Sequence, residues 1–212
     1  MKVREDLNEF INTLPKDVTL VAATKYLDIE EMKKLYQKGV NNFGENRVEA
    51  FLNKYDALKD LDIKWHFIGH LQRNKANEII NKIDYLHSLD SLKLAKLIDE
   101  KRESPLKVFI EVSINEEENK NGVKVAELDD FVSEVLKFKN IELIGLMMMS
   151  IKYSDEASLR KQFAKLKEVQ LHLEKKFNIS IPELSMGMSD DYKEAIKEGA
   201  TYIRLGRILF TM

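Results

Sequence analysis

Lys25 stands at the end of a short apolar run, in the segment VAATKY (residues 21–26). A lysine ammonium is strongly hydrated, and the simplest interpretation is a soluble residue that ends a buried strand. A lysine amine can also form a Schiff base with an aldehyde once a desolvated setting lowers its pKa. The residue type alone leaves both interpretations open, so the polar residues elsewhere in the chain must decide between them.

Two segments near the C-terminus are suited to binding an anion, SMGMSDD (185–191) and RLGR (204–207). The first precedes a predicted helix, whose free backbone N–H groups and dipole favour a negative charge. A glycine lets the backbone approach a phosphate closely, and an arginine supplies a fixed positive charge. Each segment by itself is also compatible with a plain turn and a helix cap. The candidate phosphate-binding residues are Ser185, Gly187, Ser189, Arg204 and Gly206.

Eight short β-type runs alternate with longer segments of helical period. This alternation predicts parallel strands joined by crossovers, and eight such units favour an α/β fold of the (β/α)8 TIM barrel type. We predict a single domain over residues 1–212, with an extra N-terminal helix near residues 2–14. A doubly wound sheet is also compatible with the pattern. The runs are TLVAAT (19–24), NNFG (41–44), KWHFIG (64–69), YLHSL (85–89), KVFIEV (107–112), ELIGLMM (142–148), PELSM (182–186) and YIRLG (202–206).

Helix start and stop signals lie between these runs. Asp28, with Glu31 three residues later, is typical of a capping box, and Gly39 is placed to end that helix. Stripes of apolar residues predict further helices over residues 125–136 and 159–177. The helices therefore fall where crossovers between parallel strands are needed.

Both folds bring binding groups to the carboxyl ends of the strands. Lys25 follows the first strand, and Asn46 follows the second. In barrels the loops after strands seven and eight often bind a phosphate, and these loops carry the two anion-binding segments. A phosphate and a lysine at one barrel mouth together favour an aldehyde that carries a phosphate. Pyridoxal 5′-phosphate fits this description.

Five segments carry a resemblance to a known family over nearly the whole chain: AATK (22–25), FGENRVE (43–49), WHFIGHLQRNK (65–75), SMGMSDDYKEAI (185–196) and IRLG (203–206). In their order and spacing they resemble the pyridoxal phosphate homeostasis proteins, also called the YggS-like or PROSC family. The resemblance implies the fold-type III barrel of alanine racemase without that enzyme's second, β-rich domain.

The same resemblance implies roles for individual residues. It implies a Schiff base between Lys25 and pyridoxal phosphate, and an Asn46 that lines the ring pocket. It implies that Arg204 faces the pyridine nitrogen. The residues that it places around the phosphate are Ser185, Gly187, Ser189 and Gly206.

Two segments depart from the family pattern. Arg207 follows RLG, where the family usually has a small hydroxyl residue, and it either adds a phosphate contact or points to solvent. MMMS (147–150) replaces a more usual turn that contains proline. We interpret its three methionines as barrel packing.

The resemblance implies a binding protein for intracellular pyridoxal phosphate homeostasis, without substantial turnover. The alternative is a pyridoxal phosphate-dependent amino-acid racemase, and a third hypothesis is a cofactor-free barrel enzyme that acts on a phosphorylated metabolite. Catalysis with this cofactor usually uses an acid at the ring nitrogen, and an arginine there keeps the nitrogen unprotonated. A racemase also needs bases on both faces of its substrate, one of them from the second domain, and the resemblance implies a protein without that domain. We therefore predict that the protein is not an enzyme.

Composition sets further expectations. The net charge of −2 gives no general attraction to nucleic acid or to an acidic membrane. Cysteine is absent, the N-terminal residues do not resemble a signal peptide, and the longest apolar run, LIGLMMMSI, is too short to span a bilayer. We expect a cytoplasmic monomer, with apoenzymes that use pyridoxal phosphate as its recipients.

The histidines and one acidic run receive plainer interpretations. His66 and His70 have a spacing that binds zinc on a helix, but on a strand four residues span roughly 13 Å, so we predict no metal site. His70 is a candidate ligand contact, whereas His87 and His172 are interpreted as structural or surface residues. The run EEEN (116–119) is interpreted as a solvated loop.

Overall fold

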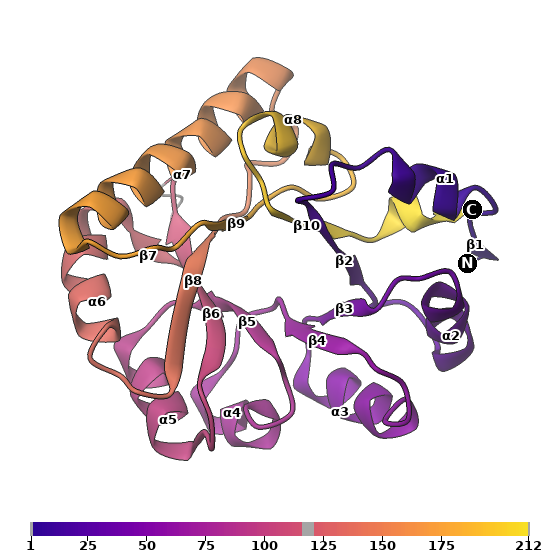
Figure 1. The fold of residues 1–212 in the computed structure, drawn as a ribbon, viewed down its shortest axis with the longest axis horizontal. Coiled ribbons are helices and arrows are strands. Elements are labelled where there is room, and N and C mark those ends of the chain that lie inside the picture. Colours follow the sequence, from indigo (N-terminus) through magenta and orange to yellow (C-terminus); the bar gives the residue numbers. More distant parts are fainter. Residues whose placement is uncertain (1, 116–120, 212) are drawn as a thin grey trace.

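Eight parallel strands close into a barrel in the computed structural model, which describes residues 2–115 and 121–211 (Figure 1). The strands pair in the order β2, β3, β4, β5, β6, β8, β9, β10, and β10 pairs in turn with β2. This closure confirms the predicted (β/α)8 TIM barrel and is incompatible with an open, doubly wound sheet. Each of the eight predicted runs coincides with one barrel strand.

Helices lie around the outside of the barrel, and three short strands are added to the predicted elements. In chain order the elements are β1 (Lys2–Val3), α1 (Leu7–Asn12), β2 (Thr19–Ala23), α2 (Ile29–Gln37), β3 (Asn42–Glu45), α3 (Val48–Ala57), β4 (Lys64–Phe67), α4 (Arg73–Ile79), β5 (Tyr85–Leu89), α5 (Leu92–Lys101), β6 (Leu106–Ser113), β7 (Val123–Lys124), the 3-10 turn η1 (Val125–Glu127), α6 (Leu128–Val135), β8 (Ile141–Met147), α7 (Glu156–Phe177), β9 (Glu183–Ser185), α8 (Tyr192–Lys197), β10 (Tyr202–Leu205), the 3-10 turn η2 (Arg207–Leu209) and β11 (Phe210–Thr211).

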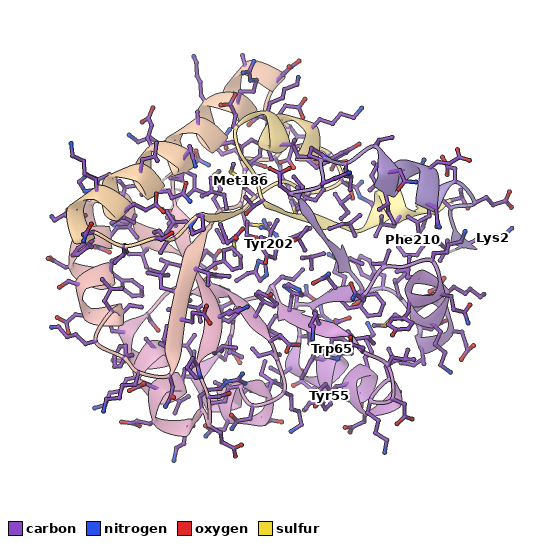
Figure 2. All side chains as sticks on the ribbon, in the orientation of Figure 1. Lys2, Tyr55, Trp65, Met186, Tyr202 and Phe210 are labelled. Carbon is purple, nitrogen blue, oxygen red and sulfur yellow. The ribbon has the colours of Figure 1, made fainter. Side chains whose placement is uncertain are left out.

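Barrel strands alternate their side chains between the surrounding helices and the barrel interior. Trp65 of β4 lies beside Tyr55 of α3 (Figure 2) and packs edge-on against Phe51 of the same helix, with ring centroids 5.3 Å apart. The next residue, His66, faces the interior, where its ring stacks on Tyr85 with centroids 4.3 Å apart. Tyr202 of β10 contacts the same interior rings. Apolar packing on the outer face of the strands therefore leaves aromatic and polar side chains inside the barrel.

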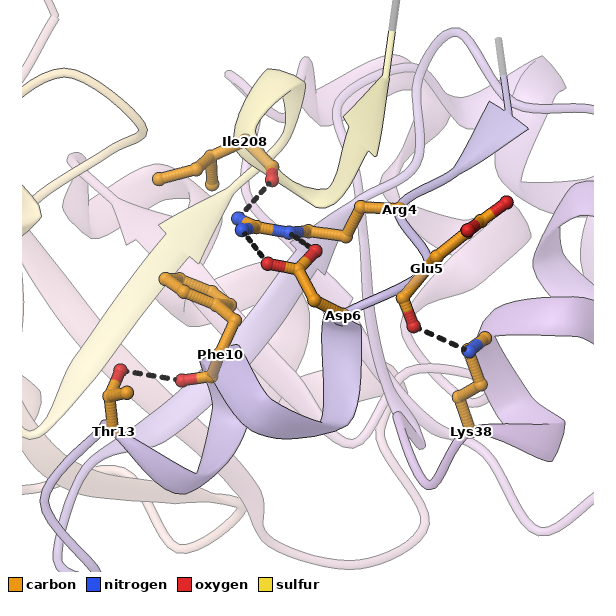
Figure 3. Close-up of polar contacts among 7 residues, drawn as sticks. All are labelled: Arg4, Glu5, Asp6, Phe10, Thr13, Lys38 and Ile208. Carbon is orange, nitrogen blue, oxygen red and sulfur yellow. Dashed lines mark hydrogen bonds and ion pairs between the residues drawn. The ribbon is translucent and has the colours of Figure 1, made fainter.

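A short antiparallel ribbon joins the first and last described strands, β1 and β11. Figure 3 shows Arg4 in this region, whose guanidinium pairs with Asp6 at 2.7 Å and donates to the carbonyl of Ile208 at 3.1 Å. The helix predicted near residues 2–14 is therefore shorter than expected and is confined to α1. Its preceding residues pair with the distant C-terminal segment, which no local pattern predicts.

The helix signals that the sequence carries are confirmed. Asp28 accepts from the Glu31 N–H at 2.8 Å, and the Glu31 carboxylate accepts from the Asp28 N–H at 3.2 Å, so the capping box is complete. Gly39 follows α2 with a φ of +90°, which favours glycine. Within the described ranges, no helix is both long and apolar enough to cross a bilayer. The acidic run 116–119 lies outside the described residues.

Candidate functional site

Lys25 lies just beyond the carboxyl end of β2, which ends at Ala23. The strand is held on one side by β3, where Ala23 pairs with Gly44, and on the other by β10, where Val21 pairs with Arg204. The Lys25 side chain is exposed, and its Nζ lies 4.5 Å from the ring centroid of Tyr26. The amine is therefore open to a ligand that enters the barrel mouth.

A buried ion pair fixes the backbone that carries Lys25. Nζ of Lys54 lies 2.6 Å from Oε1 of Glu45 and donates to the carbonyl of Thr24 at 2.6 Å. The Thr24 hydroxyl donates to the same carboxylate at 2.5 Å. Sequence reasoning missed Lys54, although it lies three residues after Phe51 on the apolar stripe of α3, where a charged residue is unusual.

Asn46 follows β3 at the same mouth and has an unsatisfied acceptor. Among the described residues, the buried side-chain atoms without a hydrogen-bond partner are Oε2 of Glu45 and Oδ1 of Asn46. The Asn46 backbone is held by close packing, because a Cβ on Gly69 would lie 2.3 Å from its carbonyl oxygen. An unpaired buried oxygen costs stability, so Asn46 is suited to accept a hydrogen bond from a bound ligand.

Arg204 enters the site from β10 and is almost completely buried. Its guanidinium donates to the hydroxyl of Ser185 at 2.6 Å and to the carbonyl of Met148 at 3.0 Å. Burial lowers the pKa of Arg204 to about 10, and the carboxylates of Glu111 and Asp191 oppose that shift. The guanidinium is therefore a fixed cation at neutral pH.

Ser185 is fully buried below Arg204, at the end of β9. Its hydroxyl accepts from Arg204 and lies 2.7 Å from Nδ1 of His87. The sequence predicts that Ser185 contacts a phosphate, whereas in the structure its hydroxyl is hydrogen-bonded to two protein groups, Arg204 and His87. Ser185 thus lies on the side of the site that holds Arg204.

The loops after β9 and β10 bring two backbone donors to one oxygen. Ser189 Oγ accepts from the N–H of Gly206 at 3.2 Å and from the N–H of Ile208 at 3.4 Å. A Cβ on Gly206 would meet only ordinary contacts with Ala23 at 3.7 Å, so packing within the protein does not require a glycine there. Convergent backbone N–H groups form anion-binding concavities, and this one could also take a phosphate oxygen.

Gly187 has a φ of +93°, and a Cβ there would lie 2.7 Å from Cβ of Ala195. We expect Gly187→Ala to lower the free energy of unfolding by about 1–3 kcal/mol, from backbone strain and overpacking together. Gly39→Ala is the matched control, because Gly39 has a φ of +90° but nothing within 4 Å of a Cβ. Urea titration of both variants should show the larger loss at Gly187, and equal losses would contradict close packing there.

An acidic group faces Arg204 from the other side of the mouth. Burial raises the pKa of Glu111 on β6 to about 7, Asp90 adds to the shift, and Arg204 and His70 oppose it. Nδ1 of His70 lies 3.1 Å from Oδ2 of Asp90, so His70 is at the mouth but pairs with protein. The sequence analysis did not name Glu111 as a site residue. The feature that could have identified it is an acidic residue near the end of the otherwise apolar run KVFIEV (107–112).

Glu111 should make the stability depend on pH. Its pKa in the folded protein lies above the ordinary value of 4.5, so the folded state keeps a proton that the unfolded chain releases. The stability from this group is full below pH 4.5 and is lost as pH rises through about 7. We expect Glu111→Gln to remove this loss, which amounts to about 2 kcal/mol by pH 8.5. Unfolding of both proteins at pH 5 and 8.5 tests it, and parallel pH profiles would argue against the shift.

A cavity of about 310 Å³ lies at this mouth, with Glu111, Ser113, Met149, Ser150 and Met188 in its lining. Met147 and Met148 are buried, as barrel packing requires. Met149 is different, because it is partly exposed and its sulfur accepts from Arg204 at 3.1 Å. The packing interpretation is therefore wrong for Met149.

A second cavity, of about 370 Å³, lies at the opposite, amino ends of the strands.

The remaining candidates pair with protein groups. Arg207 is exposed and forms an ion pair with Asp190. His172 is also exposed and lies 3.0 Å from Asp129, whereas His87 is fully buried. Among residues 2–115 and 121–211, no group of three or more histidines and acids is arranged to hold a metal ion.

The mouth thus combines an exposed amine, a buried cation, an unpaired amide oxygen and a concavity for an anion. Residues 2–212 match the family model described as alanine racemase, N-terminal domain. An alanine racemase of Clostridium difficile shares the fold, with a TM-score of 0.82 at 16% identity, and the match covers 100% of this chain and 58% of that chain. The fold and the site define a barrel of the alanine racemase class.

Two similar proteins narrow this class. A pyridoxal phosphate homeostasis protein of Aquifex aeolicus is 41% identical over 194 residues, which covers 90% of this chain and 85% of that protein. PipY of Synechococcus elongatus, solved without PLP, has a TM-score of 0.93 at 32% identity and covers 99% of this chain and 100% of that one. The structure of PipY with PLP bound has a TM-score of 0.91 at 31% identity, and the match covers 98% of this chain and 99% of that one. The chain therefore belongs to the family of pyridoxal phosphate homeostasis proteins, which confirms the resemblance of the five segments.

Proposed function

We propose that the protein binds pyridoxal 5′-phosphate at the barrel mouth, with Lys25 as the residue of attachment, and serves the homeostasis of this cofactor. One observation carries the proposal: the pairing of β10 with β2 brings the loop of Gly206 beside Ala23, the last residue of β2, two residues before Lys25. The family supports it, since PipY has been solved with PLP bound. We also propose that the protein acts in the cytoplasm as a monomer, with apoenzymes as recipients.

The residues present suit the chemistry of this cofactor, which supplies an aldehyde for an amine and a ring that accepts electrons. Lys25 would take the aldehyde, and Gly187, Ser189 and Gly206 would hold the phosphate. Oδ1 of Asn46, which has no partner in the described structure, would accept from a hydroxyl of the ring. Arg204 would donate to the ring nitrogen. Ser185 would act through Arg204, because its hydroxyl already bonds that residue.

We further propose that the protein does not turn over amino acids. Arg204, with a pKa lowered only to about 10, keeps its proton at neutral pH and therefore cannot serve as the acid for the ring nitrogen. Without that proton the ring is a weaker electron acceptor, which disfavours removal of a proton from an amino acid.

Incubation of the loaded protein with L- and D-alanine and serine in deuterated water tests this proposal. We expect deuterium at Cα at no more than about the rate with free pyridoxal phosphate, because Arg204 holds no transferable proton for the ring. An apo-aminotransferase mixed with the loaded protein should gain activity. Rapid exchange or interconversion of enantiomers would establish the alternative, an amino-acid racemase. No retention of the cofactor on gel filtration would overturn binding itself.

A further inference from the structure

A chain of hydrogen bonds runs from Arg204 through the barrel interior. Nη1 of Arg204 lies 2.6 Å from Oγ of Ser185, which lies 2.7 Å from Nδ1 of His87. Nε2 of His87 lies 2.9 Å from Nδ1 of His66, and Nε2 of His66 lies 2.9 Å from Oδ1 of Asn42. Five strands contribute one residue each, from the carboxyl end of β10 to the first residue of β3.

The two ends of this chain determine where its hydrogens lie. A guanidinium only donates, and an amide oxygen only accepts, so the bonds must all run in one direction from Arg204 to Asn42. The amide nitrogen of Asn42 donates to Asn41 at 3.1 Å, which agrees with its oxygen facing His66. Every hydrogen then has an acceptor only if both histidines are neutral with the proton on Nε2.

Burial keeps both imidazoles neutral. His66 and His87 are fully buried, and their rings lie between aromatic neighbours: His66 stacks on Tyr85 and His87 on Phe109, each with centroids 4.3 Å apart. Burial lowers the pKa of His66 to about 3 and that of His87 well below its usual value. The charge of Arg204 adds to the lowering of the pKa of His87, and the carboxylates of Glu111 and Asp191 interact in turn with Arg204.

We propose that His87 and His66 are positioning residues for Arg204: as neutral Nε2–H tautomers they hold the Ser185 hydroxyl as an acceptor of the guanidinium. Because Nδ1 of His87 takes the only hydrogen of that hydroxyl, the Ser185 oxygen presents lone pairs alone to Arg204. The guanidinium is thereby fixed toward the mouth. The inference rests on the proposed function only for its effect on ligand binding, since the bonds that hold Arg204 in this chain are all made to protein groups.

The first test uses the ligand-free protein labelled with 15N on histidine, of which the chain has four. Long-range proton–nitrogen correlation spectra between pH 5.5 and 8.5 should show two neutral Nε2–H imidazoles that do not titrate. His66→Gln and His172→Gln assign the signals. A protonated His87, or one with the proton on Nδ1, would overturn the proposal whether or not the protein binds pyridoxal phosphate.

The second test separates positioning from packing. His87→Asn keeps an oxygen that can accept from Ser185, whereas His87→Leu removes the acceptor. We expect the restrained side-chain N–H signals of ligand-free Arg204 to persist in the Asn variant and to be lost in the Leu variant. Affinity for pyridoxal phosphate should fall about tenfold in the Leu variant and less than about threefold in the Asn variant. His172→Gln, at an exposed site, is the control for affinity.

Two results would show that His87 only fills space. In the first, the Asn and Leu variants have the same Arg204 signals and the same affinity for pyridoxal phosphate. In the second, the Arg204 signals are unchanged in both variants. If His87→Leu does not fold, the Asn variant and the histidine spectra of the unchanged protein still apply. If the unchanged protein does not retain pyridoxal phosphate while the histidine and Arg204 signals behave as expected, the proposed function fails and the positioning role stands.

Discussion

Borohydride treatment of the protein loaded with pyridoxal phosphate should leave a pyridoxyl group on the peptide that contains Lys25, and on few others. The Lys25 amine is exposed at the barrel mouth, beside the loop whose N–H groups converge on Ser189. A phosphate held there would place the aldehyde near this amine at a high effective concentration. Lys25→Ala should reduce the labelled fraction to nearly zero, as measured by mass spectrometry of the digested protein.

Lys33→Ala is the matched control for this experiment. Lys33 is exposed like Lys25 and lies on the neighbouring helix α2, but its ammonium pairs with Glu30 at 2.9 Å. It should keep the full label on Lys25. Labels spread over several surface lysines, or an undiminished adduct in Lys25→Ala, would contradict the assignment of Lys25 as the residue of attachment.

Lys54→Met should lower the free energy of unfolding by about 3–5 kcal/mol, the usual cost of leaving a buried charge without its partner. Lys54 is almost completely buried, and its ammonium is the cation that faces the fully buried Glu45. Loss of this ammonium also frees the Thr24 carbonyl next to Lys25. Urea titration measures the change, and labelling of Lys25 in the same variant would show whether the site is disturbed.

Two comparisons make this result interpretable. Lys75→Met breaks an exposed pair with Glu49, so it should change stability little. The double variant Lys54→Met with Glu45→Leu removes both buried charges and should recover much of the lost stability. A small effect of Lys54→Met, or a double variant less stable than the single one, would mean that Glu45 is not held as a buried carboxylate.

Much of the fold follows from short-range patterns in the sequence. The short β-type runs became the barrel strands, and Asp28 with Glu31 formed the expected capping box, because both depend on residues close in the chain. Lys25 and the Gly206 loop could also be placed together from sequence. Parallel strands bring all their carboxyl ends to one side, so a residue at such an end has a known location before any contact is known.

The contacts within the site were decided by tertiary structure. Ser185 was predicted from the sequence to contact a phosphate, and in the structure its hydroxyl pairs with His87, which is 98 residues away in the chain. Lys54 and Glu111 gave only weak signals, since their roles depend on what the barrel buries around them. Sequence determines which residues each strand turns inward, because alternation is local. Which of those residues then meet depends on the register and closure of strands far apart in the chain, and burial within that closed barrel sets their charge.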